Sequence, residues 1–252
     1  MSKISGVIIA KNEEKMIGEA LESLSFCDEI IVINNNSTDN TNSIAEKKNA
    51  KVYDINSTDF SKLRDYGLEK SSGDWILYLD ADERISEPLR DEIKKHILGE
   101  SGYSAYFLRR KNYYFGKNEW PKIEKIERLF KKQNLKGWKG QLHESPIIEG
   151  SIGELDGYIF HFTHRDLESM LDKTIEWFSV EALLRYNSGH PQITWWRFPR
   201  VMITAFLNSY IKQQGFRAGA VGIIESMYQS FSMFITYAKL WELQHNVKLK
   251  KQ

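Results

Sequence analysis

The first hundred residues alternate between short apolar runs and segments with one apolar face. The run "SGVIIA" (5–10) is typical of a buried strand, whereas "EKMIGEALESL" (14–24) repeats apolar residues at helical spacing. The same alternation continues with strands expected at 29–34, 51–55 and 74–80 and helices expected at 42–49, 59–71 and 87–98. Repeated strand and helix units with short connections predict an α/β fold with a mostly parallel sheet flanked by helices.

The pattern changes after residue 100. Aromatic, strand-like segments are expected at 103–116 and 151–162, and a basic region with Gly and Trp separates them. From Asp166 onward the sequence is helical and rich in large apolar residues, with a break at 189–200. We therefore expect a helical C-terminal region after the α/β part of the chain.

Composition and charge exclude several classes of protein. The chain has 252 residues, of which 41% are hydrophobic and 27% charged, so it can fold around a full core. A formal net charge of +1 predicts no general affinity for nucleic acid. The single cysteine, Cys27, excludes an internal disulfide framework and fits a reducing cytosol. No uncharged apolar run reaches the roughly 18 residues of a membrane-spanning helix.

Polar clusters directly follow three of the expected strands, at Lys11–Glu14, Asn34–Ser37 and Asp80–Glu83. Ligands of a parallel sheet bind at the carboxyl ends of its strands, so we expect the clusters to share one edge and form a binding site. The last cluster crowds acids at the end of "ILYLDADERI" (76–85). Carboxylates this close repel one another unless a cation lies between them; the alternative is that Asp80 and Asp82 merely cap the following turn.

Several motifs occur in one order along the chain. They are "VIIAKNEE", "NNNSTDNT", "LRDYGLEKSSGDWILYLDADE", "ERLFKK", "LHE" and a basic aromatic tail that ends "TYAKLWE". In this order they resemble the bacterial family 2 glycosyltransferases, and most closely the β-1,4-glucosyltransferase branch that adds glucose to the lipopolysaccharide inner core. The resemblance covers nearly the whole chain. It implies the GT-A type nucleotide-diphospho-sugar transferase fold with a helical C-terminal appendage.

The resemblance also implies what each part of the chain does. Residues 1–165 correspond to a catalytic domain, with a nucleotide-binding half at 1–100 and an acceptor-facing half at 101–165. The helical region of residues 166–252 mixes aromatic and basic residues around "VMITAFLNSYI" (201–211). Such a mixture suits a helix at a membrane surface, and the alternative is a helix that packs on the core or forms a dimer.

For the crowded acids, the resemblance implies metal binding. In this family the Asp-x-Asp holds a metal that bridges the diphosphate, so Asp82, and less directly Asp80, take this role. A divalent metal stabilises the departing diphosphate without proton transfer, and oxygen ligands suit Mg²⁺ or Mn²⁺. His161 ends a late strand, where related transferases offer a further ligand.

The first two clusters are expected to bind the nucleotide sugar. The resemblance places the acid of "NEE" near the uridine, and Lys11, Asn12 and Glu13 are the residues expected there. Asn34 stands where the family has an Asp that accepts from the uracil N3–H, and its amide oxygen can still accept. Asn36 replaces a usual Gly, which is tolerable because Asn enters left-handed conformations more easily than most residues.

Two further residues are expected to take part in the reaction, one at the diphosphate and one as the base. Arg64 in "LRDYG" aligns with a family Arg that contacts the diphosphate, although Asp65 replaces a usual Asn; the alternative is a helix-surface Arg. Glu144, in the His143–Glu144 pair, is the expected base for the acceptor hydroxyl, and the alternative is a surface Glu at a strand end. Asp39 is interpreted as a helix N-terminal residue rather than a ligand contact.

The predicted function is metal-dependent, inverting transfer of one sugar, with UDP-glucose as the expected donor. The acceptor is expected to be a saccharide or lipid-linked saccharide of lipopolysaccharide core or another envelope polysaccharide, met at the inner face of the cytoplasmic membrane. Two alternatives stay open. A non-catalytic nucleotide- or membrane-binding protein would bind UDP without transfer, and a phosphotransferase or phosphatase with Asp80 as nucleophile would hydrolyse phosphomonoesters and ignore UDP.

Overall fold

The computed structural model describes residues 2–99, 102–142 and 144–246, and the chain forms two compact units. The first unit comprises Met1–Lys111 and Ile123–His161, and the second comprises Asn112–Lys122 and Phe162–Gln252. This division differs from the predicted boundary after residue 165, because the segment 112–122 belongs to the second unit.

The first unit alternates strands and helices as the sequence predicts up to residue 98. Its elements are β1 (Ile4–Ala10), α1 (Ile17–Ser23), β2 (Glu29–Asn34), α2 (Thr41–Lys47), β3 (Lys51–Asp54), α3 (Phe60–Lys70), β4 (Trp75–Asp80), β5 (Glu83–Ile85), α4 (Glu87–Leu98), β6 (Ala105–Tyr114), β8 (Glu124–Lys131), a 3₁₀ turn (Lys132–Asn134), β9 (Leu135–Lys139), β10 (Ser145–Ile148) and β11 (Ile152–Phe162). No strands were predicted in the region that forms β8 to β10, because frequent charged residues break the apolar pattern there.

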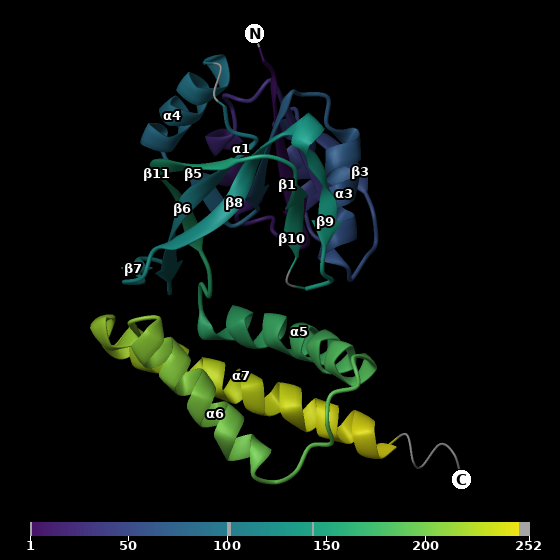
Figure 1. Ribbon diagram of the computed structural model, residues 1–252, viewed down its shortest axis with the longest axis vertical. Coiled ribbons are helices and arrows are strands. Elements are labelled where there is room, and N and C mark those ends of the chain that lie inside the picture. The colour runs from purple at the N-terminus through teal and green to yellow at the C-terminus, as the bar shows by residue number, and fades with distance from the viewer. Residues whose placement is uncertain (1, 100–101, 143, 247–252) are drawn as a thin grey trace. The chain divides into compact units, whose positions relative to one another are not determined.

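The main sheet has the strand order β3-β2-β1-β4-β8-β6-β11-β5, with β7 (Asn118–Glu119) paired to β6. Strands β3, β2, β1 and β4 are parallel, and β8 is antiparallel to both β4 and β6 (Figure 1). Ile9 pairs with Asp80, Ala10 with Asn34, and Asn34 with Asp54. The carboxyl ends of these four strands are therefore level, and the three predicted clusters share one edge of the sheet.

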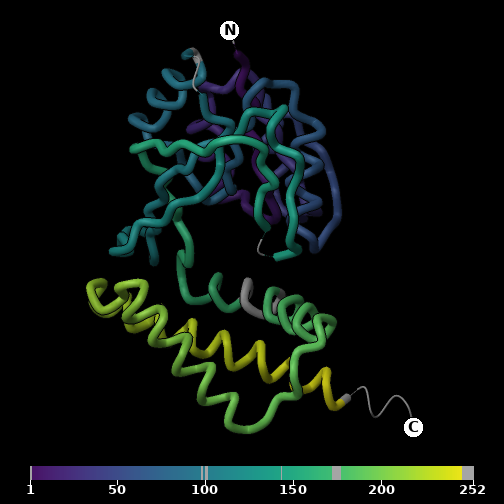
Figure 2. Tube along the Cα trace, viewed as in Figure 1, coloured from purple at the N-terminus to yellow at the C-terminus, as the bar shows by residue number. Residues whose placement is uncertain are grey.

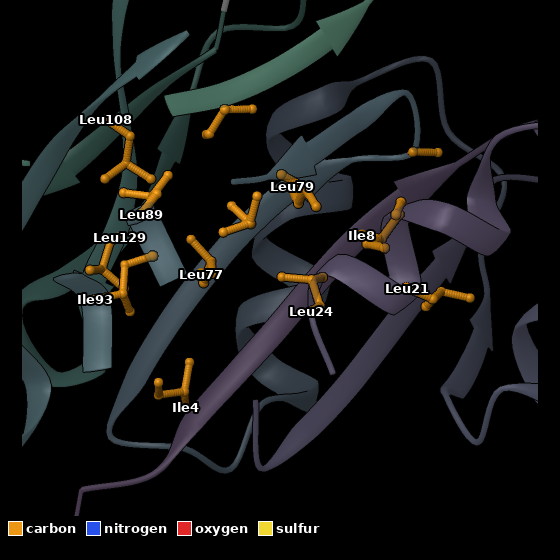
Figure 3. Packing of buried hydrophobic residues seen from close by; sticks show 14 of the residues in the cluster. Ile4, Ile8, Leu21, Leu24, Leu77, Leu79, Leu89, Ile93, Leu108 and Leu129 are labelled. Atoms are coloured by element: carbon orange, nitrogen blue, oxygen red, sulfur yellow. The ribbon is translucent and has the colours of Figure 1, made fainter. Parts of the chain in front are cut away.

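Alternate residues of each central strand enter separate cores on the two faces of the sheet. In β4, Leu77 and Leu79 pack with α1, α2 and α4 in the larger core (Figure 3), whereas Ile76 and Tyr78 pack with α3 and β9. Gly67 lets α3 approach the sheet closely, because a Cβ atom there would lie 2.6 Å from a methyl carbon of Val7. Burial on both faces fixes the positions of the strand ends that carry the polar clusters.

The second unit is helical. Its elements are α5 (Leu167–Asn187), α6 (Arg197–Leu207), a π-helical segment (Asn208–Lys212), a 3₁₀ turn (Gly215–Arg217) and α7 (Gly219–Asn246). Asp166 and Ser169 form a capping box that starts α5, and the chain then leads through α6 to α7, which packs against both other helices (Figure 2). Within the described residues, no helix is both long and apolar enough to cross a membrane.

Glu29 ties together the amino ends of the parallel strands. Its Oε1 accepts hydrogen bonds from Ser5 Oγ and from the backbone N–H of Ser72, both at 2.6 Å, and its Oε2 accepts from Lys51 Nζ at 2.7 Å. Burial alone would raise the pKa of this carboxyl, but the hydrogen bonds from Lys51, Ser5 and Ser72 outweigh burial and lower the pKa to about 2.

We therefore expect Glu29→Gln to reduce the free energy of unfolding at pH 7 by about 2–3 kcal/mol. Because the folded-state pKa lies below the unfolded value, this contribution is fully present above pH ~4.5 and is lost as pH falls through about 2. Urea unfolding between pH 7 and pH 3 measures the difference. Glu22→Gln is the control, because Glu22 pairs with Lys48 but is 66% exposed; equal effects of the two variants would contradict the assignment.

Candidate active site

Asp80 lies at the end of β4 between two arginines. Its Oδ1 is 3.3 Å from Arg64 Nη2 of α3, and its Oδ2 is 2.6 Å from Arg128 Nη2 of β8. Burial acts to raise the pKa of Asp80, but the charges of Arg128, Arg64 and Arg110 more than offset burial and hold the pKa well below its usual range. Asp80 is therefore an ionised anchor for two guanidinium groups.

Arg64 joins Asp80 to Glu144. Only 3% of the Arg64 side chain is exposed, and its Nε donates to Glu144 Oε1 at 2.7 Å. Its guanidinium carbon lies 4.9 Å from the centroid of the Trp138 ring. The structure thus brings together the predicted diphosphate contact, the first Asp of the Asp-x-Asp motif and the predicted base. His143 lies outside the described residues.

Glu83 fixes the turn that carries Asp82. Its buried carboxylate accepts from the backbone N–H of Asp80 at 3.0 Å and from Arg110 Nη1 at 2.9 Å, and lies 3.8 Å from Arg128 Nη2. Asp80 and Glu83 therefore share a cluster of three arginines. The close acids at the end of β4 are tolerated partly because protein cations surround them.

Asp82 faces His161, which extends from β11. Asp82 Oδ1 and His161 Nε2 are 3.6 Å apart, and both side chains are largely buried. Burial alone would lower the pKa of His161, but the hydrogen bond and charge of Asp82, together with Glu83, raise it above the ordinary value.

The pair fits a divalent cation. Two ligand atoms 3.6 Å apart can both contact one metal at about 2.1–2.2 Å. The described residues contain no group of three or more His, Cys, Asp or Glu side chains arranged to hold a metal. Mg²⁺ and Mn²⁺ sites in transferases of phosphate esters need few protein ligands, because substrate oxygens and water complete the shell.

The Asn34 cluster is held by hydrogen bonds at the ends of β2 and β3. Asn34 is buried; its Nδ2 donates to Asp54 Oδ1 at 2.6 Å, and its Oδ1 accepts from the backbone N–H of Ser37 at 3.1 Å. Asn36 has φ +57°, so the left-handed conformation expected for this replacement of Gly is confirmed. The amide of Asn34 therefore orients Asp54, whose carboxylate lies exposed at the strand end.

The loop after β1 is joined to the loop after β2. Asn12 has φ +54°, and its Oδ1 accepts from the backbone N–H of Thr38 at 2.8 Å. Asp39 lies two residues before α2 and accepts from the backbone N–H groups of Glu14 and of Thr41, the first residue of that helix, each at 3.0 Å. Lys11 is exposed beside this junction and Glu13 is buried in it.

Asp65, the departure next to Arg64, connects α3 to β9. Its Oδ1 accepts from the backbone N–H of Trp138 at 2.9 Å, and burial raises the pKa of its carboxyl. This bond helps to position the ring of Trp138 against Arg64.

Arg110, Arg128 and Asp54 belong to the arrangement but were not predicted from the sequence, whereas Glu83 is part of the predicted cluster Asp80–Glu83. For Asp54 a signal was available, since it lies next to the last residue of the strand predicted at 51–55, and it ends β3 in the structure. Arg128 lies within the motif "ERLFKK", which carries the family resemblance, but its contact with Asp80 depends on the pairing of β8 with β4.

Comparisons with known proteins show the family of the chain. The sequence profile of Glycosyl transferase family 2 matches residues 5–150. An uncharacterized glycosyltransferase of Rickettsia typhi is 30% identical over an alignment 258 residues long. The alignment covers 96% of this chain and 88% of that protein. The chain belongs to glycosyltransferase family 2. It is therefore a glycosyltransferase. The strand-end cluster lies at the carboxyl edge of the sheet, where open α/β sheets bind ligands.

Two further comparisons concern proteins whose names describe a role or a bound ligand. The lipopolysaccharide core biosynthesis glycosyltransferase LpsC of Rhizobium meliloti is 25% identical, with 98% of this chain and 94% of that protein covered. The crystal structure of Staphylococcus aureus TarS residues 1–349 in complex with UDP-GlcNAc matches with a TM-score of 0.51 at 16% identity, covering 97% of this chain and 92% of that one. The predicted GT-A fold is confirmed.

Proposed function

We propose that this family 2 enzyme transfers a single sugar, with inversion, from a UDP-sugar to a saccharide acceptor of the cell envelope. The observation that carries the proposal is the bridge made by Arg64, which places a buried cation between Asp80 and Glu144 at the carboxyl edge of the sheet. Such an edge binds nucleotides in open α/β sheets. The name of LpsC supports a lipopolysaccharide core acceptor, and glucose is the donor sugar that the motif resemblance favours.

In the proposed reaction, Glu144 takes the proton of an acceptor hydroxyl as that oxygen forms a bond to the anomeric carbon. The bond from this carbon to the diphosphate breaks, and its electron pair leaves with UDP. Arg64 and Arg128, oriented by Asp80, place positive charge beside the leaving group. Asp82 and His161 would hold Mg²⁺ or Mn²⁺, which supplies further neutralisation of the diphosphate when bound.

The nucleoside is proposed to lie over the ends of β1 to β3, where Lys11, Asn12 and Glu13 meet the Asn34 cluster. Because both ends of the Asn34 amide are bonded within the protein, Asp54 is the carboxylate best exposed to accept from a nucleobase. We further propose a cytoplasmic location at the inner membrane surface, where lipid-linked saccharides are accessible.

Calorimetric titration of UDP with and without Mn²⁺ tests the donor site. We expect Asp82→Ala to weaken metal-dependent UDP binding about 10- to 100-fold, because one of the two protein ligands is lost. Asp74→Ala, an exposed Asp at the opposite edge of the sheet, is the matched control and should bind as the wild type does. The absence of UDP binding by the wild-type protein under all metal conditions would overturn the proposed donor. UDP binding without transfer from UDP-glucose or related donors to any envelope saccharide would instead favour a non-catalytic protein.

A further inference from the structure

Large apolar side chains are exposed along one face of α6. From the residue before α6 to its π-helical continuation, exposed apolar residues follow one another at spacings of seven and four residues and so lie on the same side: Trp196, Ile203, Leu207 and Ile211. Trp195, just before the helix, is 81% exposed. The helix contains no fully buried residue.

The opposite face of α6 makes the contacts that hold the second unit together. The Phe198 ring lies 5.7 Å from that of Phe234 in α7, and Ser230 of α7 donates to the backbone carbonyl of Met202 at 3.0 Å. α6 and α7 lie side by side (Figure 1), and the Phe198 and Met202 contacts come from the face of α6 opposite the exposed stripe.

The charge around the stripe is of one sign. Residues 182–224 contain five Lys and Arg residues and no Asp or Glu. Among them, Arg200 and Lys212 are exposed on α6 and its continuation, and the guanidinium carbon of Arg200 lies 5.6 Å from the Trp196 ring centroid. An apolar stripe bordered by cations and aromatic rings is complementary to an anionic lipid surface.

The same charges disfavour a second copy of the chain as the occupant. A two-fold interface brings each patch against itself, so Arg200 and Lys212 of one copy would face a patch of the same sign, with no acid from residues 182–224 to pair with. An anionic bilayer instead provides the opposite charge together with an apolar layer for the leucine and isoleucine side chains.

We infer that this face, formed by Trp195, Trp196, Ile203, Leu207 and Ile211, docks α6 flat on an anionic lipid bilayer. The aromatic rings lie at the level of the headgroups, and Arg200 and Lys212 contact lipid phosphates. The inference makes the proposed membrane location specific to one surface of the protein. It requires neither the proposed donor nor the proposed acceptor, so vesicle binding can fail while sugar transfer is retained.

Vesicle flotation of the full chain tests the inference, with phosphatidylcholine vesicles compared with vesicles that also contain phosphatidylglycerol. We expect binding to the anionic vesicles only, and we expect Leu207→Glu to weaken it about 20-fold or more, since burial of a leucine is replaced by a repelled charge. Arg200→Gln should weaken binding about fivefold. High salt should also weaken binding, because it screens the attraction between the cations and the lipid phosphates.

The matched control is Leu183→Glu in α5. Leu183 is 47% exposed and Leu207 is 46% exposed, so each substitution adds one negative charge at a similarly exposed position. Thermal unfolding of the two variants checks that they are equally stable. Leu183→Glu should retain most of the vesicle binding. Brominated lipid should quench tryptophan fluorescence, and Trp195→Phe should remove part of that quenching.

Three results would overturn the inference. The first is equal binding to neutral and anionic vesicles, and the second is equal loss of binding in the Leu207 and Leu183 variants. The third is a dimer, measured by light scattering, that Leu207→Glu dissociates while the wild-type protein binds no vesicles; a second copy would then cover the face.

Discussion

Glu144→Gln should lower kcat for sugar transfer about 10³-fold while leaving the affinity for UDP unchanged. The amide oxygen of Gln can still accept the hydrogen bond that Arg64 Nε donates to Glu144 Oε1, so the buried arginine keeps a partner. What the amide lacks is the capacity to take a proton from the acceptor hydroxyl. The expected loss therefore falls on the chemical step and not on donor binding.

Single-turnover transfer and calorimetric UDP titration separate these two effects. Glu149→Gln is the control, because Glu149 is exposed near the same hairpin and pairs with Lys136 on the surface. It should leave transfer unchanged. If Glu144→Gln transfers sugar at the wild-type rate, the base is another residue; if it loses UDP affinity and stability together, Glu144 has a structural role only.

The elements up to residue 98 could be predicted because their information is local. Each parallel strand is a short apolar run, and each helix has one apolar face, since the sheet is covered on both sides. The clusters at the strand ends followed from the same pattern, because parallel strands present their carboxyl ends at one edge. The positions of Asp80 and Asn34 at the ends of two such runs were therefore enough to assign both residues to one edge of the sheet.

The arginine cluster could not be predicted in this way. Arg128 lies on β8, which pairs antiparallel with β4, and Arg110 lies on β6, the strand beyond β8; both strands come from a later part of the chain. No local pattern encodes that neighbour relation. The sequence therefore suggested a cation to neutralise Asp80, and the structure shows that protein guanidinium groups already provide positive charge there.

The largest expected effect on stability follows from removing the central member of this cluster. We expect Arg64→Met to reduce the free energy of unfolding by about 3–5 kcal/mol, because the 3% exposed Arg64 is the partner of two partly buried carboxylates and its loss leaves them less compensated. Asp80 keeps Arg128 at 2.6 Å, and Glu144 is 14% exposed and can reach water, so the lower end of this range is the more appropriate. The methionine side chain retains apolar contact with Trp138, which limits any cavity.

Urea unfolding of matched variants isolates the electrostatic part of this loss. Arg109→Met removes an arginine of the same sheet that pairs with Glu154 at the surface, and it should cost less than about 1 kcal/mol. Adding Glu144→Gln to Arg64→Met should recover part of the stability, because the orphaned charge is removed together with its partner. Equal destabilisation by the Arg64 and Arg109 substitutions would show that the buried pairs contribute no more than surface ones. In that case the role of Arg64 would be to bind the diphosphate and not to stabilise the fold. Its burial between Asp80 and Glu144 would then lower stability in favour of sugar transfer.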